Sequence, residues 1–329
     1  MNRPLATIGI PTIGGRSAYF RSALDSALAQ TYAPLEILVG DNSANAGVQA
    51  SLSALTGRDP RIRYFHHASR VPFAVSWNSL VTNARGEYLA FLADDDRLHP
   101  TFIEDLMGLR EANPGAQVFF SNHAVIDSDG HLRTEAGAEF AERYRRAELP
   151  PGLLPNPELT AWRNSIPMVS MMASTALLRA LPFRDDLNTP EIEFFLRAAQ
   201  RGVGFVYTDA VLADYRVHLQ TETQRGLMVD RLAAYLLPLA ASAGCEEAKR
   251  QRLSDLLPGA VTRTLLEGDA RSARAFVRSE YYPPLTWRHP TTWLHRVCVA
   301  LPDDLASATF RALYRFGRQA VARRASQAK

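Results

Sequence analysis

The stretch Tyr88-Leu89-Ala90-Phe91-Leu92-Ala93-Asp94-Asp95-Asp96-Arg97 decides the fold class of this 329-residue chain. It begins with strand-forming apolar residues, and such a run is typical of a buried strand. Three adjacent carboxylates cannot stay buried without partners. We therefore expect them at the strand's carboxyl end, where open α/β sheets bind ligands. Their oxygens suit Mg²⁺ or Mn²⁺, usually shared with a substrate diphosphate; a solvated acidic turn is the alternative.

Strand-like and helix-like segments alternate on both sides of this stretch. We expect strands over residues 5–10, 35–40, 61–65 and 117–120, a helix around Phe20 to Leu28, and helices over 75–84 and 101–113. This rhythm predicts an α/β fold with a doubly wound, mostly parallel sheet. Residues 140–166 are expected to form a loop or excursion. Structure returns at 169–178, in a helix over 191–201 and in strands near 205–207 and 211–215.

The chain changes character near residue 220, where helical patterns begin to dominate. Helix-like segments cover residues 227–243, 248–266 and 270–278, and Pro283-Pro284 interrupts the pattern. The last segment, 307–324, is amphipathic, with Arg311, Arg315 and Arg318 recurring on one side. Such a helix can lie on an anionic membrane surface. The alternative is that its apolar stripe docks on the catalytic domain and its arginines face water.

Composition and charge indicate a globular protein and argue against a nucleic-acid-binding one. The hydrophobic fraction is 47% and the charged fraction 22%, as in ordinary globular proteins. From residue 220 onward there are 17 Lys and Arg against 10 Asp and Glu, whereas the preceding part has 20 against 24. An acidic front part argues against nucleic-acid binding. Cys245 and Cys298 form no paired motif, and the chain enters its first strand without a leader-like segment, so we expect a cytoplasmic location.

Glycines near the first strand do not form a standard phosphate-binding loop. Gly9, Gly14 and Gly15 lack the G-x-G-x-x-G spacing, and no Lys-Ser/Thr pair follows them as a P-loop requires.

A broader pattern resembles glycosyltransferase family 2. It comprises residues 23–32 (ALDSALAQTY), residues 35–43 (LEILVGDNS), Trp77-Asn78, the segment 84–88 and the Asp-rich turn ahead of Pro100. It reappears at 191–197, 201–202 and 215–218, so the resemblance covers about residues 5–220. It implies a GT-A fold that uses nucleotide-sugar donors. Residues 1–220 are then the catalytic domain, and 221–329 form a helical C-terminal region.

The resemblance implies donor-binding roles for residues at the strand ends. Pro11 and Thr12 match the loop that contacts the nucleoside, and Asp41 matches an acidic residue that accepts a hydrogen bond from the base. A carboxylate suits an imide or amino donor on a base edge; a helix cap or turn residue is the alternative. Asn78 is either a polar contact to the donor or a capping residue.

The Asp-rich turn departs from the family pattern at its first position. The usual form is Asp-x-Asp-Asp, and Ala93 occupies the first Asp position. Asp95 then matches the residue that binds the metal, with Asp96 beside it. Asp94 is expected to compensate for the contact that Ala93 cannot make.

Two later segments supply the remaining candidates. Register with Leu196-Arg197 places Glu191 on the family's general base, which is usually an Asp, and Glu193 is the fallback. Acidic residues also favour a first helical turn through the helix dipole alone. The resemblance implies that His218 completes the metal site or contacts the diphosphate, and a surface or capping histidine is the alternative. Arg216 is either a diphosphate clamp or a structural ion-pair residue.

Together these features predict an inverting glycosyltransferase that needs Mn²⁺ or Mg²⁺ and modifies a glycan or glycolipid acceptor. Synthesis of surface polysaccharide or glycolipid is the role that family habit implies. The expected location is the cytoplasm, with peripheral membrane contact through the last helix as an open alternative. Two other classes remain: a catalytically inactive glycosyltransferase-like binding or assembly protein, and a nucleotidyltransferase, which should carry an additional basic triphosphate-binding loop.

Overall fold

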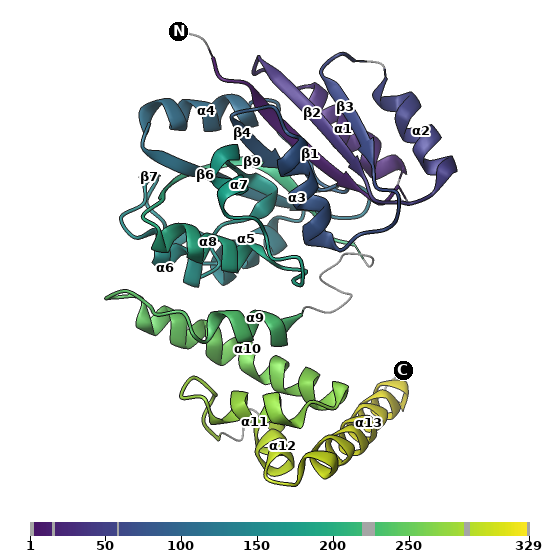
Figure 1. The fold of residues 1–329 in the computed structure, drawn as a ribbon, viewed down its shortest axis with the longest axis vertical. Coiled ribbons are helices and arrows are strands. Elements are labelled where there is room, and N and C mark those ends of the chain that lie inside the picture. Colours follow the sequence, from purple (N-terminus) through teal and green to yellow (C-terminus); the bar gives the residue numbers. More distant parts are fainter. Residues whose placement is uncertain (1–2, 15–16, 58, 219–227, 286–289, 328–329) are drawn as a thin grey trace. The chain divides into compact units, whose positions relative to one another are not determined.

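The computed structural model describes residues 3–14, 17–57, 59–218, 228–285 and 290–327 (Figure 1). The chain divides into two compact units, Met1–Leu227 and Met228–Lys329. The boundary expected after residue 220 falls among residues 219–227, which lie outside the described residues.

The first unit is built on one nine-stranded sheet. Its strands are β1 (Ala6–Thr12), β2 (Leu35–Asp41), β3 (Ile62–His66), β4 (Tyr88–Phe91), β5 (Arg97–Leu98), β6 (Ala116–Ile126), β7 (Gly152–Leu153), β8 (Met171–Ser174) and β9 (Gly204–Arg216). The order is β3-β2-β1-β4-β8-β6-β9-β5, and β7 pairs with β9. This confirms the predicted α/β class.

The strands from β3 to β4 are paired in parallel, and in the rest of the sheet only β6 and β9 are. β3, β2, β1 and β4 are mutually parallel, and β6 is parallel to β9. β8 is antiparallel to both β4 and β6, and β5 and β7 are antiparallel to β9. The sheet is therefore parallel where it carries the strand ends of the predicted donor site, and mixed beyond β8.

Helices cover both faces of this sheet, as a doubly wound fold requires. They are α1 (Ser17–Leu28), α2 (Ala46–Thr56), α3 (Phe73–Asn83), α4 (Phe102–Ala112), α5 (Thr134–Arg143), α6 (Pro157–Trp162), α7 (Thr175–Ala180) and α8 (Glu191–Gln200), with 3₁₀ turns η1 (Arg146–Glu148) and η2 (Met168–Ser170). Phe20 of α1 and Phe102 of α4 share one core with Ile8 and Ile37. On the other face Trp77 of α3 stacks on Phe91, at 4.7 Å between ring centroids.

The structure corrects the expected loop at residues 140–166. This region contains the end of α5, η1, β7 and α6. Its polar composition concealed short elements that are held by the sheet, such as β7 on the edge of β9. The two strands expected near 205–207 and 211–215 are one strand, because β9 follows β6 through irregularities in register between Ser121 and His123.

A buried hydrogen-bond network fixes the entry to β4. Glu36 on β2 accepts hydrogen bonds from the Thr7 hydroxyl, the Arg85 amide and the Arg63 guanidinium, at 2.6–2.8 Å. A Cβ on Gly86 would lie 2.7 Å from the Thr7 amide nitrogen, so only glycine fits at this crossing. The turn before β4 is thus tied to β1, β2 and β3, and this sets where the Asp-rich turn emerges.

The described part of the second unit is helical. Its helices are α9 (Val229–Leu236), α10 (Glu246–Glu267), α11 (Ala270–Arg278), α12 (Pro290–Val299) and α13 (Asp303–Gln327). The bounds of α11 match the sequence prediction, whereas α12 was not predicted. Cys245 and Cys298 are buried thiols. Within the described ranges, no helix is both long enough and apolar enough to cross a membrane.

Candidate active site

An open cleft lies at the carboxyl ends of β1, β2 and β4, where parallel α/β sheets bind ligands. The strands end at Thr12, Asp41 and Phe91, and the chain segments that follow them form the cleft. The residues that line it are Pro11, Thr12, Ile13, Asn42, Phe73, Ser76, Trp77, Ala93, Asp94, Asp95, Asp96, Tyr215 and Arg216. Six of the residues predicted from the sequence therefore meet in one place.

Each carboxylate of the Asp-rich turn has a different partner. Asp94 accepts a hydrogen bond from the Thr12 hydroxyl at 2.7 Å, and Asp96 accepts one from the backbone amide of Arg216 at 2.8 Å. Oδ2 of Asp95 lies 2.9 Å from Nε2 of His218. Burial, with the negative charge of Asp95 beside it, holds the pKa of Asp96 well above its usual range. Strand β9 thus brings two predicted residues, Arg216 and His218, onto the turn.

Arg216 holds the turn together as well as lining the cleft. Its Nε donates to the Asp95 carbonyl at 2.7 Å, and Nη1 donates to the carbonyls of Asp127 and Ser128 at 2.9 and 3.2 Å. Its guanidinium lies over the Tyr19 ring at 4.6 Å, and the same ring packs against His218 at 5.4 Å. The partners of the Arg216 guanidinium in these contacts are backbone carbonyls and an aromatic ring, not a carboxylate. Arg216 could bind a diphosphate only while it also makes these contacts.

Asp41 is fully buried at the end of β2 and is absent from the cleft lining. Its Oδ1 accepts from the Ser43 amide at 2.8 Å and its Oδ2 from the Tyr64 hydroxyl at 2.9 Å. Burial, followed by the contact with Asp41, raises the pKa of the Tyr64 phenol. The bond from the Ser43 amide is the turn interaction that the sequence analysis gave as the alternative for Asp41. Its next neighbour, Asn42, is the residue that reaches the cleft.

Asn78 is engaged elsewhere in the fold. Its Nδ2 donates to the Phe183 carbonyl at 2.7 Å, and its Oδ1 accepts from the Phe183 amide at 3.0 Å. Both halves of the amide therefore tie α3 to the segment before α8. The polar atoms of the Asn78 side chain thus bind the Phe183 backbone, and a contact with the donor stays a prediction.

The two acidic residues at the start of α8 have different environments. Glu193 is buried, and its Oε1 accepts from Nε of Arg184 at 2.8 Å and Nε of Arg197 at 2.7 Å. Glu191 is half-buried and has no arginine among its described contacts. Desolvation raises the pKa of Glu191 to about 7, partly opposed by its own backbone amide. Of the two, Glu191 has the properties of a proton acceptor near neutral pH.

Aromatic residues that the sequence analysis did not single out form the apolar wall of the cleft. Phe73 packs on Trp77 at 4.6 Å, and both line the cleft with Ile13. Within the described residues, Ser76 Oγ and Trp77 Nε1 are buried without a hydrogen-bond partner. Their sequence signal was weak, because aromatic residues at helical spacing look like ordinary core.

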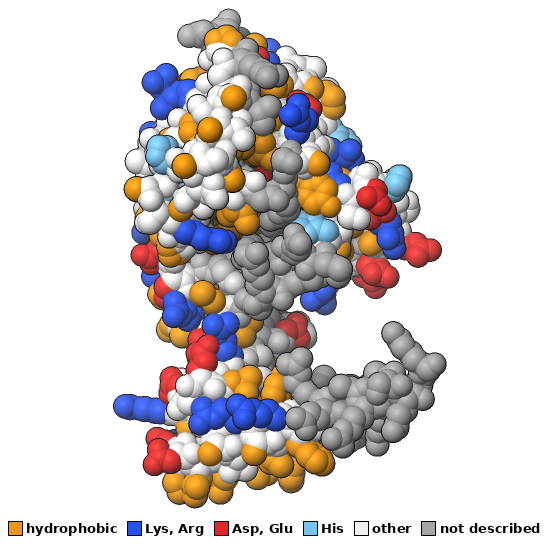
Figure 2. Space-filling model, turned by 90° about the vertical axis from the view of Figure 1, so that its right-hand side faces the viewer, with side chains coloured by type: hydrophobic (Ala, Val, Ile, Leu, Met, Phe, Trp, Pro, Cys, Tyr) orange, Lys and Arg blue, Asp and Glu red, His pale blue; other side chains and the backbone are white. Residues whose placement is uncertain are grey.

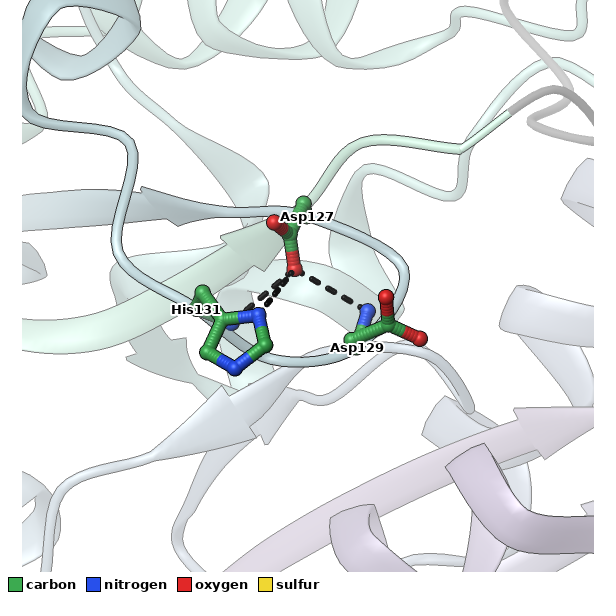
Figure 3. A group of neighbouring side chains, drawn as sticks. All are labelled: Asp127, Asp129 and His131. Carbon is green, nitrogen blue, oxygen red and sulfur yellow. Dashed lines mark hydrogen bonds and ion pairs between the residues drawn. The ribbon is translucent and has the colours of Figure 1, made fainter.

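A separate acidic group lies in the turn after β6. Asp127, Asp129 and His131 place possible ligand atoms within 4.8 Å of one another, the one such group of three among the described residues (Figure 3). Oδ1 of Asp127 accepts from the backbone amides of Asp129 and His131 at 3.0 and 2.9 Å. These bonds are those of an exposed turn. The group is distinct from the predicted ligands Asp95, Asp96 and His218, of which Asp96 is turned towards the Arg216 amide.

Comparisons with known sequences find a family match for the part of the chain that carries the Asp-rich turn. The model of "Glycosyl transferase family 2" matches residues 7–161. An uncharacterized glycosyltransferase of Rickettsia bellii is 30% identical over 138 residues, which cover 40% of this chain and 20% of that protein. The GalNAc(5)-diNAcBac-PP-undecaprenol beta-1,3-glucosyltransferase of Campylobacter jejuni is 30% identical over 142 residues, covering 43% and 44%. The chain spans about a fifth of the length of the relatives from Rickettsia bellii and Rickettsia felis.

Solved structures share the fold at low sequence identity. TarS 1-349 of S. aureus, in complex with UDP-GlcNAc, has a TM-score of 0.61 and 13% identity, covering 95% of this chain and 92% of that one. The mannosyltransferase PcManGT of Pyrobaculum calidifontis, in complex with GDP-Man and Mn²⁺, has a TM-score of 0.58 and 15% identity, covering 96% and 88%. The fold is therefore of the GT-A type, and residues 7–161 match the family 2 glycosyltransferase model, in agreement with the sequence resemblance.

Proposed function

We propose that this chain is a metal-dependent, inverting glycosyltransferase that moves a sugar from a nucleoside-diphosphate sugar to a hydroxyl group of a glycan or glycolipid. The observation that carries the proposal is the cleft at the strand ends. There Thr12, three consecutive carboxylates and Arg216 meet, with His218 held 2.9 Å from Asp95. This arrangement combines acidic ligands for a cation with a polar floor for a diphosphate.

The residues present fit a divalent cation. A carboxylate and an imidazole together are ligands that Mn²⁺ accepts. The side chains of Asp95 and His218 are 15% and 6% exposed, so the pair is shielded but reachable from the cleft. Asp95 and His218 would hold the ion, with Asp96 as a further oxygen ligand once it leaves the Arg216 amide. A bound cation would neutralise the charge that develops on the departing nucleoside diphosphate.

The part of the cleft that is lined by Phe73 and Trp77 suits a nucleoside. Phe73 and Trp77 offer apolar surface for a base or ribose. Buried polar groups are normally satisfied, so the unpartnered Ser76 Oγ and Trp77 Nε1 favour a ligand that supplies acceptor oxygens. Two proteins of this fold bind UDP-GlcNAc and GDP-Man, which supports a nucleotide-sugar donor without fixing the base.

Glu191 is proposed as the general base. With a pKa near 7 it is substantially ionised at neutral pH, yet basic enough to accept a proton. It would take the proton of the acceptor hydroxyl as that oxygen attacks the anomeric carbon from the face opposite the leaving diphosphate. Such a single displacement inverts the anomeric centre. The ion pairs of Glu193 with Arg184 and Arg197 favour Glu191 over Glu193 for this role.

The acceptor is proposed to be a glycan or glycolipid of a surface-polysaccharide pathway. The Campylobacter relative acts on a sugar chain linked through diphosphate to undecaprenol, a lipid acceptor. A cytoplasmic location with access to the membrane surface would suit such a substrate.

One alternative has a specific observation in its favour. Ala93 lines the cleft where the family pattern has an Asp, and Glu191 stands where the family has an Asp. A catalytically inactive domain that binds a nucleotide sugar would tolerate both changes.

A panel of UDP-, GDP- and dTDP-sugars tested with Mn²⁺ distinguishes an active glycosyltransferase from an inactive binding domain. We expect hydrolysis or transfer with at least one donor, its loss in EDTA, and a decrease of roughly 100-fold or more in Asp95→Asn. Asp25→Asn, an exposed residue of α1, is the matched control and should retain full activity. Metal-dependent donor binding without turnover would support the inactive alternative. If the protein bound none of these donors, both the active-enzyme hypothesis and the inactive-domain hypothesis would be refuted.

A further inference from the structure

Exposed hydrophobic side chains gather in the second unit. Among the residues that the structure describes, eleven large hydrophobic side chains are exposed, and seven of them belong to this unit. The seven are Leu266, Leu285, Trp293, Val297, Leu305, Leu313 and Phe316. The unit holds 102 of the 329 residues, so the concentration is well above what its size would give. Concentrated apolar exposure marks an interaction surface.

Five of these residues lie on the last two described helices. On α12, Trp293 and Val297 are one turn apart, and the opposite side of the helix is buried through His295 and Cys298. On α13, Leu305, Leu313 and Phe316 are exposed, whereas Ala306 and Phe310 are buried. We call Trp293, Val297, Leu305, Leu313 and Phe316 the outer face.

The outer face points away from the rest of its unit. Phe310 of α13 packs against His295 of α12 at 5.3 Å, and both helices contact α10 and α11. Part of the amphipathic stripe expected at 307–324 thus packs inside the second unit, whereas the docking alternative placed it on the catalytic domain. The five residues of the outer face stay exposed on the same two helices.

The charge of the unit complements an anionic surface. Residues 228–329 include 16 Lys and Arg against 9 Asp and Glu, a net charge of +7. Arg311 and Arg315 lie on α13 beside the exposed apolar residues, and the sequence of the helix continues with Arg318, Arg323 and Arg324. Of the acidic residues in its first turn, Asp303 is paired with Arg274 at 2.6 Å. Figure 2 shows hydrophobic side chains along the lower edge of this unit, below a row of basic ones.

We propose that the outer face docks on an anionic lipid membrane. Tryptophan and phenylalanine favour the boundary between headgroups and acyl chains. Arginines beside them can extend towards the lipid phosphates while their methylene groups cover apolar surface. Because no described helix can span a bilayer, the contact is peripheral.

A second copy of the chain is the less favourable occupant of the same face. A symmetric pair would bring the same surface of two units together, each carrying a net charge of +7. Like charges would oppose that contact, whereas anionic lipids attract the arginines and accept the aromatic rings. The proposal does not depend on glycosyl transfer, since it rests on the second unit alone.

Co-sedimentation of the full chain with vesicles tests the proposal. We expect binding to phosphatidylcholine vesicles that contain phosphatidylglycerol, weak binding to phosphatidylcholine alone, and a decrease in binding as salt rises. The double variant Trp293→Ser/Phe316→Ser should lower the partition coefficient by about tenfold or more. Arg315→Glu should lower it by a similar factor, since each basic residue near such a surface contributes about 1 kcal/mol.

Matched controls come from the first unit. Leu132 and Leu153 are 62% and 59% exposed, comparable with Trp293 at 60% and Phe316 at 73%. Leu132→Ser/Leu153→Ser should leave vesicle binding unchanged, and so should Arg133→Glu at an exposed position. Thermal unfolding of every variant checks that these surface changes preserve the fold.

Three outcomes would overturn the inference. The first is failure of the wild-type chain to sediment with anionic vesicles. The second is equal loss of binding in the outer-face and control variants. The third is a concentration-dependent dimer in light scattering that the outer-face variants abolish, without any vesicle binding, which would assign the face to a second copy.

Discussion

Replacing Glu191 by Gln should stabilise this protein at neutral pH while removing sugar transfer. Desolvation raises the pKa of the folded-state carboxyl from 4.5 to about 7. Between these values the folded protein keeps a proton that the unfolded chain releases. The free energy of unfolding therefore falls as pH rises from about 4.5 to about 7, and it stays at the lower value above that range.

The size of the effect follows from the same pKa values. At about 1.4 kcal/mol per pKa unit, and with allowance for the partial exposure of Glu191, ionisation costs the folded state about 2–3 kcal/mol. Glutamine resembles the protonated acid and escapes this cost. Glu191→Gln and the wild type should have equal stability near pH 4, and the variant should be more stable by about 2–3 kcal/mol at pH 8.

Urea unfolding at several pH values from 4 to 8 measures this difference. Glu193→Gln is the matched control, because it removes the negative charge that pairs with Arg184 and Arg197 and should destabilise the protein. If the stability difference between Glu191→Gln and the wild type did not change with pH, the raised pKa would be wrong.

Activity should follow the opposite course from stability. Wild-type transfer should rise with pH through about 7 as Glu191 ionises, and Glu191→Gln should lose about 100- to 10,000-fold in turnover. Retention of full transfer by Glu191→Gln would remove it as the general base even if the stability result held.

Three further substitutions test the cleft and its support. In Asp95→Asn, Mn²⁺ should no longer raise the thermal unfolding midpoint in the presence of a nucleoside diphosphate, and an unchanged metal-dependent shift would reject this ligand. Arg216→Ala removes donors to three backbone carbonyls and should lower the free energy of unfolding by about 2–4 kcal/mol, measured in urea. Asn78→Ala should cost about 1–3 kcal/mol through its two bonds to Phe183 while donor affinity, measured by calorimetry, stays the same. A selective loss of donor affinity in that variant would restore Asn78 to the binding site.

Several predictions succeeded because their signals are local. The apolar run before the Asp-rich turn could only be a buried strand, and β4 occupies it. Helix α11 matched its predicted bounds because Asp269 caps its first turn and apolar residues recur at helical spacing behind it. The acidic start of α8 was likewise visible in sequence.

Other features depended on contacts that no local pattern records. Short elements in residues 140–166 are stabilised by neighbours in the sheet, so their polar composition suggested a loop. Asn78 resembled a binding residue until its amide was found on the Phe183 backbone, 105 residues away. Register in the sequence favoured Glu191 over Glu193, but the different surroundings of the two carboxyls appear only in the structure.

The sequence by itself determined the α/β class, the family and the place where carboxylates emerge from the sheet, since apolar periodicity and strand-end chemistry are properties of neighbouring residues. The tertiary structure decided which groups share the cleft. Strand β9 runs beside β6 and brings His218 to Asp95 across 123 positions of sequence, while the Arg216 amide takes Asp96. Such pairings are set by sheet order and register, which depend on the free energy of the whole packed core.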